Sequence, residues 1–266
     1  MLAGGKSTLT QYLIEERRRV PEASGDLNAL VTGISLACKA ISRRVAYGSL
    51  DGGSASRSFP GSADAPSQPP TSLPVIAHEM FLRANEWGGH VAGMLSQGHD
   101  EPCPVPQQFP SGKYLLLFNA LDGAPNAEVN VTVGSIFSIV HAPRPGQRAE
   151  APDFLQRGSL QVCAGYAIYG PATMLVLTMG NGTHAFTLDP LLGEWVLSHS
   201  DLQIPRRTRE FAINASKSRF WEPAVKRYVD ECLAGQPGVR EADFSMRWIA
   251  SLVAETHRIL MCGGVF

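Results

Sequence analysis

Residues 113–139 read KYLLLFNALDGAPNAEVNVTVGSIFSI, and this stretch decides the fold class. Residues 113–118 form a short and almost wholly apolar run, which predicts a buried strand. Asp122 and Gly123 follow the run as a turn. Residues 129–140 then alternate small and β-branched side chains, which predicts a second strand. On its own this turn is ordinary, but many layered α/β proteins use such a turn to present a carboxylate to a metal and backbone N–H groups to phosphate.

Three segments before this stretch have the apolar spacing of amphipathic helices. Residues 8–19 predict the first helix, and Ser7 or Thr8 is a suitable N-cap. Residues 26–44 predict the second, with Asp26 as its cap and a long apolar stripe. Residues 75–82 predict the third.

The chain beyond residue 140 predicts strands first and a mixture of strands and helices later. Strands are expected at residues 161–179 (two strands, or a strand and a bend, about Gly170-Pro171), 184–188, 194–197 and 211–214, helices at 222–233 and 247–260, and the start of a further strand at 263–266. An apolar strand needs partners to pair with, so we expect a C-terminal piece to be missing.

Residues 48–74 interrupt the helical patterns of the N-terminal part. Glycine, serine and proline supply more than half of this segment. Such a composition buries too little apolar surface to offset the entropy lost on ordering, so a loop or a disordered segment is expected. Loops of this length inside a compact domain are usually functional or disordered.

Composition places the chain among globular proteins of the cytoplasm. Its 266 residues are 44% hydrophobic and 18% charged, and the formal net charge of -1 gives no reason to expect nucleic acid or a membrane as a partner. Five cysteines without a C-x-x-C pair favour reduced thiols over disulfides or a zinc site. No apolar run is long enough to cross a bilayer, and the N-terminus shows no secretory signal.

Residues 113–139 resemble a segment of the class I fructose-1,6-bisphosphatases, in which the strand ends in D-P-L-D-G-S-S-N-I-D. The likeness continues, in order, through further blocks of the chain. These blocks are residues 8–10, 79–90, 164–177, 186–194, 211–214 and 247–255. Chance does not produce so many blocks in the same order.

The resemblance implies a layered α/β sugar-phosphatase fold of the αβαβα type. It implies an N-terminal domain over residues 1–203 and a C-terminal domain, incomplete here, over residues 204–266. The implied activity is hydrolysis of the 1-phosphate of fructose 1,6-bisphosphate to fructose 6-phosphate and phosphate, in gluconeogenesis or the Calvin cycle. The implied cofactor is Mg2+, held between carboxylates and phosphate, and the implied assembly is a homotetramer.

The resemblance also assigns residues to the metal and to the substrate. Asn119, Leu121 and Asp122 match metal-binding positions, Leu121 through its main-chain carbonyl. The substrate-binding turn matches four consecutive residues, Asp122, Gly123, Ala124 and Pro125. The last two replace a pair of serines, so two hydroxyls and one backbone N–H are lost. Catalytic residues are not assigned from the sequence.

Further matches concern the second phosphate of the substrate and a regulatory site. Asn214, Arg247 and Trp248 match residues that hold the 6-phosphate. In the family the arginine reaches in from a neighbouring subunit, and a tyrosine usually stands at the position of Trp248. Lys113 and Tyr114 match a pair that binds AMP in some members.

Most metal-binding carboxylates of the family are replaced in this chain. Asn119 stands where the family has an aspartate, and Ser96-Gln97-Gly98 stands where it has Ser-Glu-Glu. Residues 71–75 read TSLPV where the family has K-K-L-D-V, whose aspartate helps to orient the attacking water. A final glutamate ligand and a substrate lysine would lie beyond Phe266. Because hard cations depend on anionic oxygen, we expect impaired turnover.

Three functions are compatible with this pattern. The first is a working enzyme of the family, in which Asp100, Glu101 or Glu128 substitutes for a lost ligand or a missing tail is supplied elsewhere. The second is a catalytically inactive paralogue that binds sugar phosphate or regulates an active subunit. The third is a damaged gene product, in which residues 48–74 and the end at Phe266 are relics.

Overall fold

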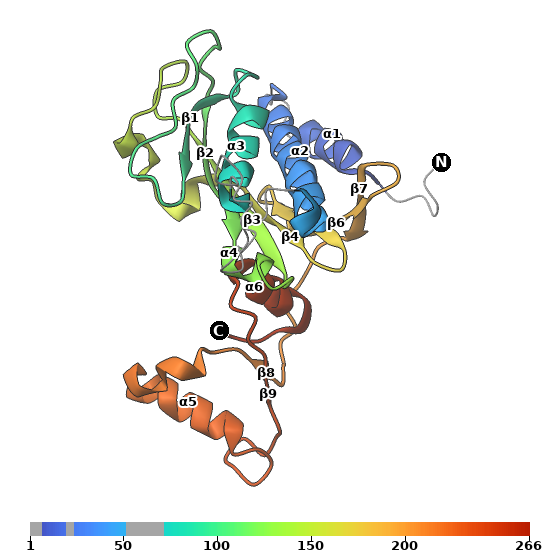
Figure 1. Cartoon of the computed structure of the whole chain (residues 1–266), viewed down its shortest axis with the longest axis vertical. Helices are drawn as coiled ribbons and strands as arrows, with labels where there is room; N and C mark the ends of the chain where they lie inside the picture. Colours follow the sequence, from blue (N-terminus) through green and yellow to red (C-terminus); the bar gives the residue numbers. More distant parts are fainter. Residues whose placement is uncertain (1–6, 20–23, 52–71) are drawn as a thin grey trace, which may run out of the picture.

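The computed structural model describes residues 7–19, 24–51 and 72–266, and a seven-stranded mixed sheet forms its centre (Figure 1). The strands lie side by side in chain order: β1 (Val91–Ser96), β2 (Tyr114–Asp122), β3 (Val133–His141), β4 (Gln161–Tyr169), β5 (Thr173–Thr178), β6 (Thr183–Asp189) and β7 (Glu194–His199). β1 and β2 are parallel, whereas all other neighbours are antiparallel. The carboxyl ends of β1 and β2 therefore meet at one edge of the sheet.

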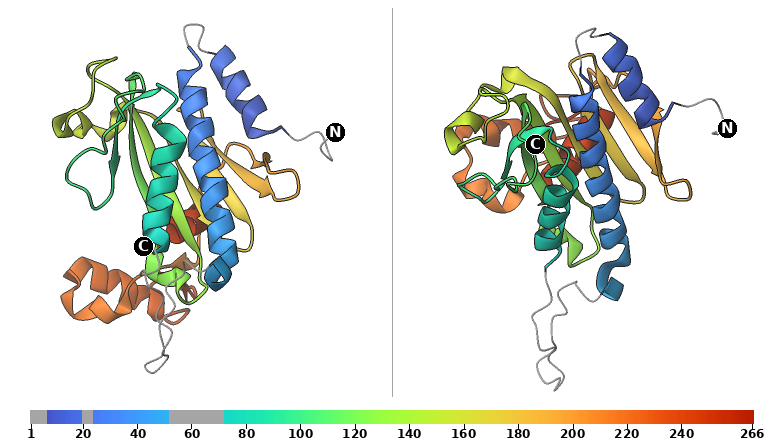
Figure 2. Two further views of the ribbon diagram at one scale, coloured as in Figure 1. Left: turned by 45° about the horizontal axis from the view of Figure 1, so that its top comes forward. Right: turned by 90° about the horizontal axis from the view of Figure 1, so that it is seen from above.

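Three helices, α1 (Leu9–Arg18), α2 (Asp26–Tyr47) and α3 (Leu73–Asn85), pack on one face of the sheet (Figure 2). A capping box starts α1, because the Thr8 hydroxyl accepts a hydrogen bond from Gln11 N while the Gln11 side chain accepts one from Thr8 N. The helices α2 and α3 approach closely at Gly33, where a Cβ atom would lie 2.6 Å from Oδ1 of Asn85. The 3-10 turn η1 (Gly48–Asp51) follows α2.

Alternate residues of the strands face opposite layers. On β4, Ala167 and Tyr169 belong to the cluster beneath the three helices, whereas Tyr166 and Ile168 pack with Val253 on the opposite face. That second face is covered by α6 (Leu252–Cys262) at one end and by a smaller cluster around the 3-10 turn η2 (Ala151–Phe154) at the other. A sheet between helical layers confirms the predicted layered α/β fold.

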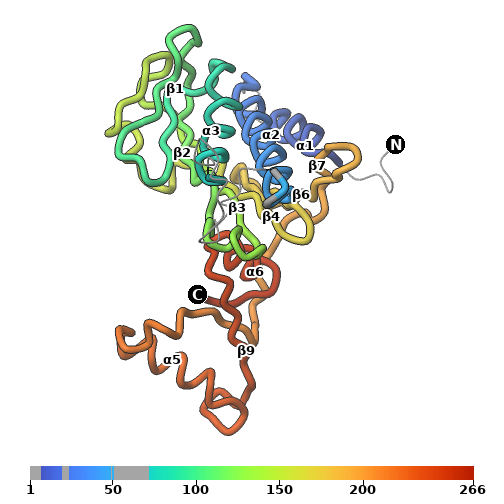
Figure 3. The backbone as a smooth tube through the Cα atoms, viewed as in Figure 1, coloured from blue at the N-terminus to red at the C-terminus, as the bar shows by residue number. Residues whose placement is uncertain are grey.

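The segment after β7 forms a smaller unit that projects from the sheet (Figure 3). It holds the short parallel pair β8 (Glu210–Phe211) and β9 (Ser245–Met246), the 3-10 turn η4 (Ala215–Phe220) and the helix α5 (Pro223–Leu233). Phe211, Val229 and Cys232 form its buried cluster. Residues 263–266 do not form the strand expected there, although Ala212 N donates a hydrogen bond of 2.8 Å to Val265 O.

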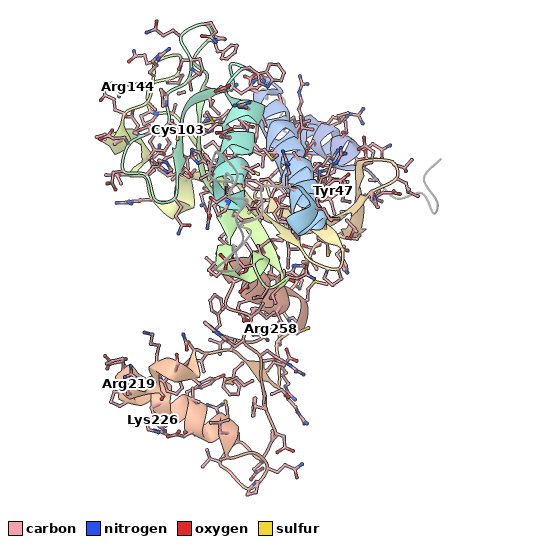
Figure 4. All side chains as sticks on the ribbon, in the orientation of Figure 1. Tyr47, Cys103, Arg144, Arg219, Lys226 and Arg258 are labelled. Carbon is pink, nitrogen blue, oxygen red and sulfur yellow. The ribbon has the colours of Figure 1, made fainter. Side chains whose placement is uncertain are left out.

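One ion-pair network joins this unit to α6. The guanidinium of Arg258, labelled in Figure 4, pairs with Glu255 at 3.2 Å and with Glu210 of β8 at 3.0 Å. The Glu255 side chain is almost fully buried, and it also accepts a hydrogen bond from Ile249 N. The network therefore ties β8 to the helix that covers the sheet.

Several predicted elements are confirmed. Residues 161–179 form β4 and β5, and the hairpin-like pair is β6 and β7. The three N-terminal helices and α5 also lie where the apolar spacing predicts them. Within the glycine- and serine-rich stretch 48–74, residues 52–71 lie outside the described residues, and α3 already begins at Leu73.

Two predicted strands have the wrong bounds. The strand expected from residue 129 begins at Val133, because Gly123 (φ 71°) turns the chain into the short helix α4 (Ala124–Ala127). The strand expected over residues 211–214 is only β8, since the Asn214 side chain instead accepts a hydrogen bond from Ser216 N and caps η4.

The last helix was predicted too long, and one strand was missed. The helix expected over residues 247–260 begins at Leu252, because Ala250 has a left-handed backbone (φ 60°) and Ser251 serves as the N-cap. The strand β1 was not predicted, although it is buried along most of its length. Its Gly93 and Met94 are not among the β-branched and aromatic residues that usually predict a strand. In the part of the chain that the structure describes, no helix combines the length and the apolar character needed to cross a bilayer.

The left-handed Ala250 is expected to cost stability. This conformation costs an L-residue about 1–2 kcal/mol, whereas glycine adopts it without a steric penalty. Ala250→Gly should therefore raise the free energy of unfolding by about 0.5–1 kcal/mol, after allowance for the entropy that glycine loses on folding. Urea denaturation followed by circular dichroism measures the change.

Ala254→Gly provides a matched control, because Ala254 is buried within α6. The same substitution should there lower the free energy of unfolding by about 1 kcal/mol. Equal losses from both variants would contradict the assignment of strain to Ala250.

Candidate active site

A cavity of about 550 Å³ opens at the edge where β1 and β2 end. We call it the β1–β2 cavity. Residues from three elements line it: Pro74, Val75 and His78 of α3, Ser96, Gln97, Gly98 and His99 at the end of β1, and Asn119, Ala120, Leu121, Asp122 and Gly123 at the end of β2. Ligand sites in α/β sheets lie at the carboxyl ends of strands, so this position favours a binding site.

The segment Asn119–Gly123 is shaped by a break in the ladder. The register between β2 and β3 shifts between Asn119 and Asp122, which releases the end of β2 from regular pairing. Gly123 then adopts a left-handed backbone (φ 71°), and a Cβ atom there would lie 3.0 Å from the Cβ of Ser251. Glycine thus permits both the turn and the close approach of α6.

The carboxylate of Asp122 is held by the first turn of α6. Its Oδ2 accepts hydrogen bonds from Ser251 Oγ at 2.6 Å and from Val253 N at 3.0 Å. A carboxylate at the N-terminus of a helix is stabilised by the unpaired backbone N–H groups and by the helix dipole. The predicted site residue is therefore also a structural link between β2 and α6.

Asn119, Leu121 and Asp122 are brought together, but they do not fit Mg2+ as the resemblance implies. Of the described residues that line the cavity, Asp122 is the only carboxylate, and its Oδ2 is already hydrogen-bonded. Within residues 7–19, 24–51 and 72–266, no three histidine, cysteine or acidic side chains are grouped so as to hold a metal. Mg2+ prefers several anionic oxygens in octahedral geometry, which this set does not supply.

The three acidic residues expected to substitute for lost metal ligands do not supply those ligands in the β1–β2 cavity. Asp100, Glu101 and Glu128 are exposed, and none of them lines the β1–β2 cavity. Glu128 lines a neighbouring cavity of about 610 Å³ instead. Ala124 and Pro125, predicted as part of the substrate turn, line that same neighbouring cavity rather than the β1–β2 cavity.

Two histidines and a serine in the cavity were not predicted as site residues. His78 Nδ1 lies 3.0 Å from the Oγ of Ser96, whose side chain is buried. The His78 ring stacks on His99, with 4.7 Å between the centroids. Burial lowers the pKa of His78 and the neighbouring His99 lowers it further, whereas Glu79 raises it. The sequence offers no spacing signal for the pair, because the two residues come from different elements.

Asn214, Arg247 and Trp248 lie outside the β1–β2 cavity. Asn214 caps η4, and the Nε of Arg247 lies 3.5 Å from Glu210 Oε1 with most of its side chain exposed. Trp248 is partly exposed between β9 and α6. Within one chain, these residues are therefore not brought to the cavity.

Lys113 and Tyr114 line a separate cavity of about 380 Å³, which we call the Lys113 cavity. Lys113 Nζ pairs with Asp26 at 2.9 Å and hydrogen-bonds Ser24. The hydrogen bond from Ser24, and next that from Lys113, holds the pKa of Asp26 below its usual range. The cavity also reaches Glu16, Asn28 and His141, so α1, α2 and the sheet all contribute to it.

Fold and site together define a layered α/β protein with a cavity at the carboxyl ends of two parallel strands. Two family models match the chain: "Fructose-1-6-bisphosphatase, N-terminal domain" over residues 7–200, and "Fructose-1-6-bisphosphatase, C-terminal domain" over residues 204–266. A class 1 fructose-1,6-bisphosphatase from Methylibium petroleiphilum is 66% identical over 268 residues, which cover 100% of this chain and 74% of that protein. One from Hydrogenophilus thermoluteolus is 58% identical and covers 97% of this chain and 72% of that protein.

Solved structures agree with the sequence matches. The holo form of Leishmania major fructose-1,6-bisphosphatase superposes with a TM-score of 0.82 at 30% identity, over 97% of this chain and 77% of that chain. Its apo form gives a TM-score of 0.81. The chain belongs to the class 1 fructose-1,6-bisphosphatase family.

The link between Asp122 and Ser251 can be tested by stability measurements. Ser251→Ala removes both the hydrogen bond to Asp122 and the N-cap bond to Ala254 N. The free energy of unfolding should fall by about 1–2 kcal/mol, because a helix cap and a bond to a charged group are lost together. A double-mutant cycle with Asp122→Asn should give a coupling energy of about 1 kcal/mol.

Ser200→Ala, at an exposed position after β7, is the control and should leave stability nearly unchanged. Strict additivity of Ser251→Ala and Asp122→Asn would show that the two side chains are energetically independent.

Proposed function

We propose that the β1–β2 cavity binds a sugar bisphosphate, and that the chain hydrolyses the 1-phosphate of fructose 1,6-bisphosphate to fructose 6-phosphate and phosphate. We further propose that turnover is much slower than in a relative with the full set of carboxylates. The turn Asp122–Gly123, placed beside the cavity at the carboxyl end of β2, carries this proposal. Membership of the family supports it.

The roles proposed for this chain's own residues concern binding. Gly123 allows the backbone to approach the phosphoryl group, and Asn119 offers an amide to it or to a cation. Asp122 keeps the turn in place through its bonds to α6. When bound in the family, Mg2+ supplies charge neutralisation and an activated water. Because the residues present do not fit Mg2+, we derive no step through it.

A second candidate function is favoured by one observation. The β1–β2 cavity has a volume of about 550 Å³, and a single carboxylate lies among the described residues that line it. A protein that binds a sugar phosphate without cleaving it needs the cavity and not the metal cluster. A regulatory or binding paralogue is therefore the alternative.

The remaining assignments are proposals that the family resemblance supports. Asn214, Arg247 and Trp248 are proposed to hold the 6-phosphate. Of these three, Arg247 is proposed to act on a neighbouring subunit of a homotetramer, as the arginine does in the family. The boundary between domains 1–203 and 204–266, a role in gluconeogenesis or the Calvin cycle, and a cytoplasmic location stay predictions.

Restoring two lost carboxylates tests the enzymatic proposal. Gln97→Glu combined with Asn119→Asp adds two anionic ligands beside Asp122, whereas Gly98 (φ 84°) cannot take a side chain without strain. Phosphate release from fructose 1,6-bisphosphate in Mg2+ should rise at least about tenfold over the parent chain, because divalent-cation affinity grows with anionic oxygen. A chelator should abolish the gain.

Gln107→Glu combined with Gln108→Glu adds the same charge at exposed positions outside the cavity and should change nothing. If neither the parent nor the restored chain releases phosphate, while calorimetry still detects sugar bisphosphate, the binding function is supported instead.

The Lys113 cavity provides a separate test of the regulatory proposal. Lys113→Met removes the cation that AMP phosphate would contact, so AMP affinity measured by calorimetry should fall at least about fivefold. Lys226→Met, on the exposed face of α5, is the control. Equal AMP affinity in parent and Lys113→Met would exclude the cavity as an AMP site.

A further inference from the structure

We propose that the imidazoles of His78 and His99 hold a tetrahedral oxyanion, such as the phosphoryl group of a sugar phosphate, in the β1–β2 cavity without a metal ion. The inference deepens the proposed function, because it assigns the cation that replaces the missing metal cluster at the same site. It rests on the geometry of three elements that converge on the cavity.

The His78 ring is oriented by contacts with each of those elements. Its Nδ1 lies 3.0 Å from Ser96 Oγ at the end of β1. One face stacks on His99 with an interplanar angle of 10°, and the ring also packs against Phe118 of β2 with 5.6 Å between centroids. A hydrogen bond at Nδ1 selects the ring orientation and leaves Nε2 as the second polar atom. The hydrogen bond and the ring contacts therefore hold the two imidazoles in place before a ligand binds.

The stacked geometry does not suit a shared metal ion. The coordinating lone pair of an imidazole lies in the plane of its ring. Two nearly parallel rings, with 4.7 Å between centroids, do not direct these lone pairs at one point. An anion has no such requirement, since it needs only N–H donors and positive charge nearby.

The described lining of the cavity is less acidic than the resemblance implies. Where the resemblance implies acidic residues, the lining has Pro74, Gln97, Gly98 and Asn119, which are all neutral. Asp122 turns one oxygen toward α6. A phosphoryl dianion therefore meets one carboxylate instead of a cluster, and a single proton on the histidine pair compensates that charge.

We expect the histidine pair to take up a proton when the oxyanion binds. Glu79 on α3 acts on the charge of His78, and Asp122 at the end of β2 lines the same cavity. Cys103 hydrogen-bonds the backbone at Ser96, and burial raises the pKa of its thiol. Asp100 and Glu101 follow His99 on the exposed loop. Burial and the second ring favour neutral His78, whereas a bound dianion favours its charged form. Two charged rings would repel when stacked, so up to one proton is taken up per bound anion. The affinity for the anion therefore falls as pH rises through the pKa of the histidine pair in the anion complex.

Sulfate is the probe that tests the proposal, because it stays a dianion between pH 5.5 and 8.5, whereas phosphate titrates within this range. The ring protons of the histidines are followed by NMR in the full chain, with chelator present and ionic strength balanced by chloride. Saturating sulfate should raise the pKa of at least one ring of the pair by about half a unit or more. Sulfate should also bind more tightly at pH 6 than at pH 8, by up to about threefold for a shift of half a unit and by more for a larger shift.

Variants assign the signals and provide the controls. His78→Asn and His99→Asn should each remove one ring signal and reduce the pH dependence of sulfate binding. His99 is exposed, so its replacement should leave the fold intact. His199→Asn, at an exposed position on β7, should leave that pH dependence unchanged. His141 lines the Lys113 cavity and reports separately on any sulfate bound there.

Unchanged pKa values of both rings at saturating sulfate would overturn the inference, and so would shifts that appear only when Mg2+ is added. The proposed function fails by a different measurement, the absence of phosphate release from fructose 1,6-bisphosphate. Ring shifts without phosphate release would leave the oxyanion site standing in a binding protein. Metal-dependent release of phosphate without pKa shifts of the rings would support the enzymatic function and contradict the oxyanion site.

Discussion

The contact between the Asp122 carboxylate and the first turn of α6 holds the two halves of the chain together at the site. Asp122 ends β2 in the middle of the sequence, whereas Ser251 and Val253 belong to the helix that covers the far face of the sheet. Because the carboxylate satisfies backbone and cap groups of α6, the helix is seated where Gly123 allows it to approach. The floor of the β1–β2 cavity and the attachment of the C-terminal unit thus depend on the same side chain.

Asp122 lines the cavity and also holds α6, so its replacement would affect both the site and the packing of that helix. A member of the family that loses carboxylates at other positions loses metal affinity, but the loss of Asp122 would also weaken the docking of α6. The surrounding cavity keeps its polar hydroxyl, amide and imidazole groups at Ser96, Asn119 and His78. Hydroxyl, amide and imidazole groups can donate hydrogen bonds to an anion, which is the basis of the oxyanion site proposed for this cavity.

The sequence predicted the sheet strands after β2, the three N-terminal helices and the turn at Asp122, because apolar periodicity and glycine turns report local structure. It did not predict where the last helix begins, since the left-handed Ala250 carries no composition signal. It grouped Asn119, Leu121 and Asp122 correctly, as neighbours in sequence must lie close in space. It missed His78 and His99, because the stack joins a helix to a loop and exists only through tertiary packing. The separation of Arg247 from the cavity likewise depends on the placement of the C-terminal unit.

The strand order of the sheet has a consequence for how the chain reaches its native state. Strands β2 to β7 each pair with their neighbour in sequence, so no pairing within this meander joins strands that are distant in sequence. The bond between Asp122 and Ser251 instead joins residues 129 positions apart. During synthesis on the ribosome the meander can therefore form before α6 has emerged, and the turn beside β2 reaches its final shape only when that helix docks.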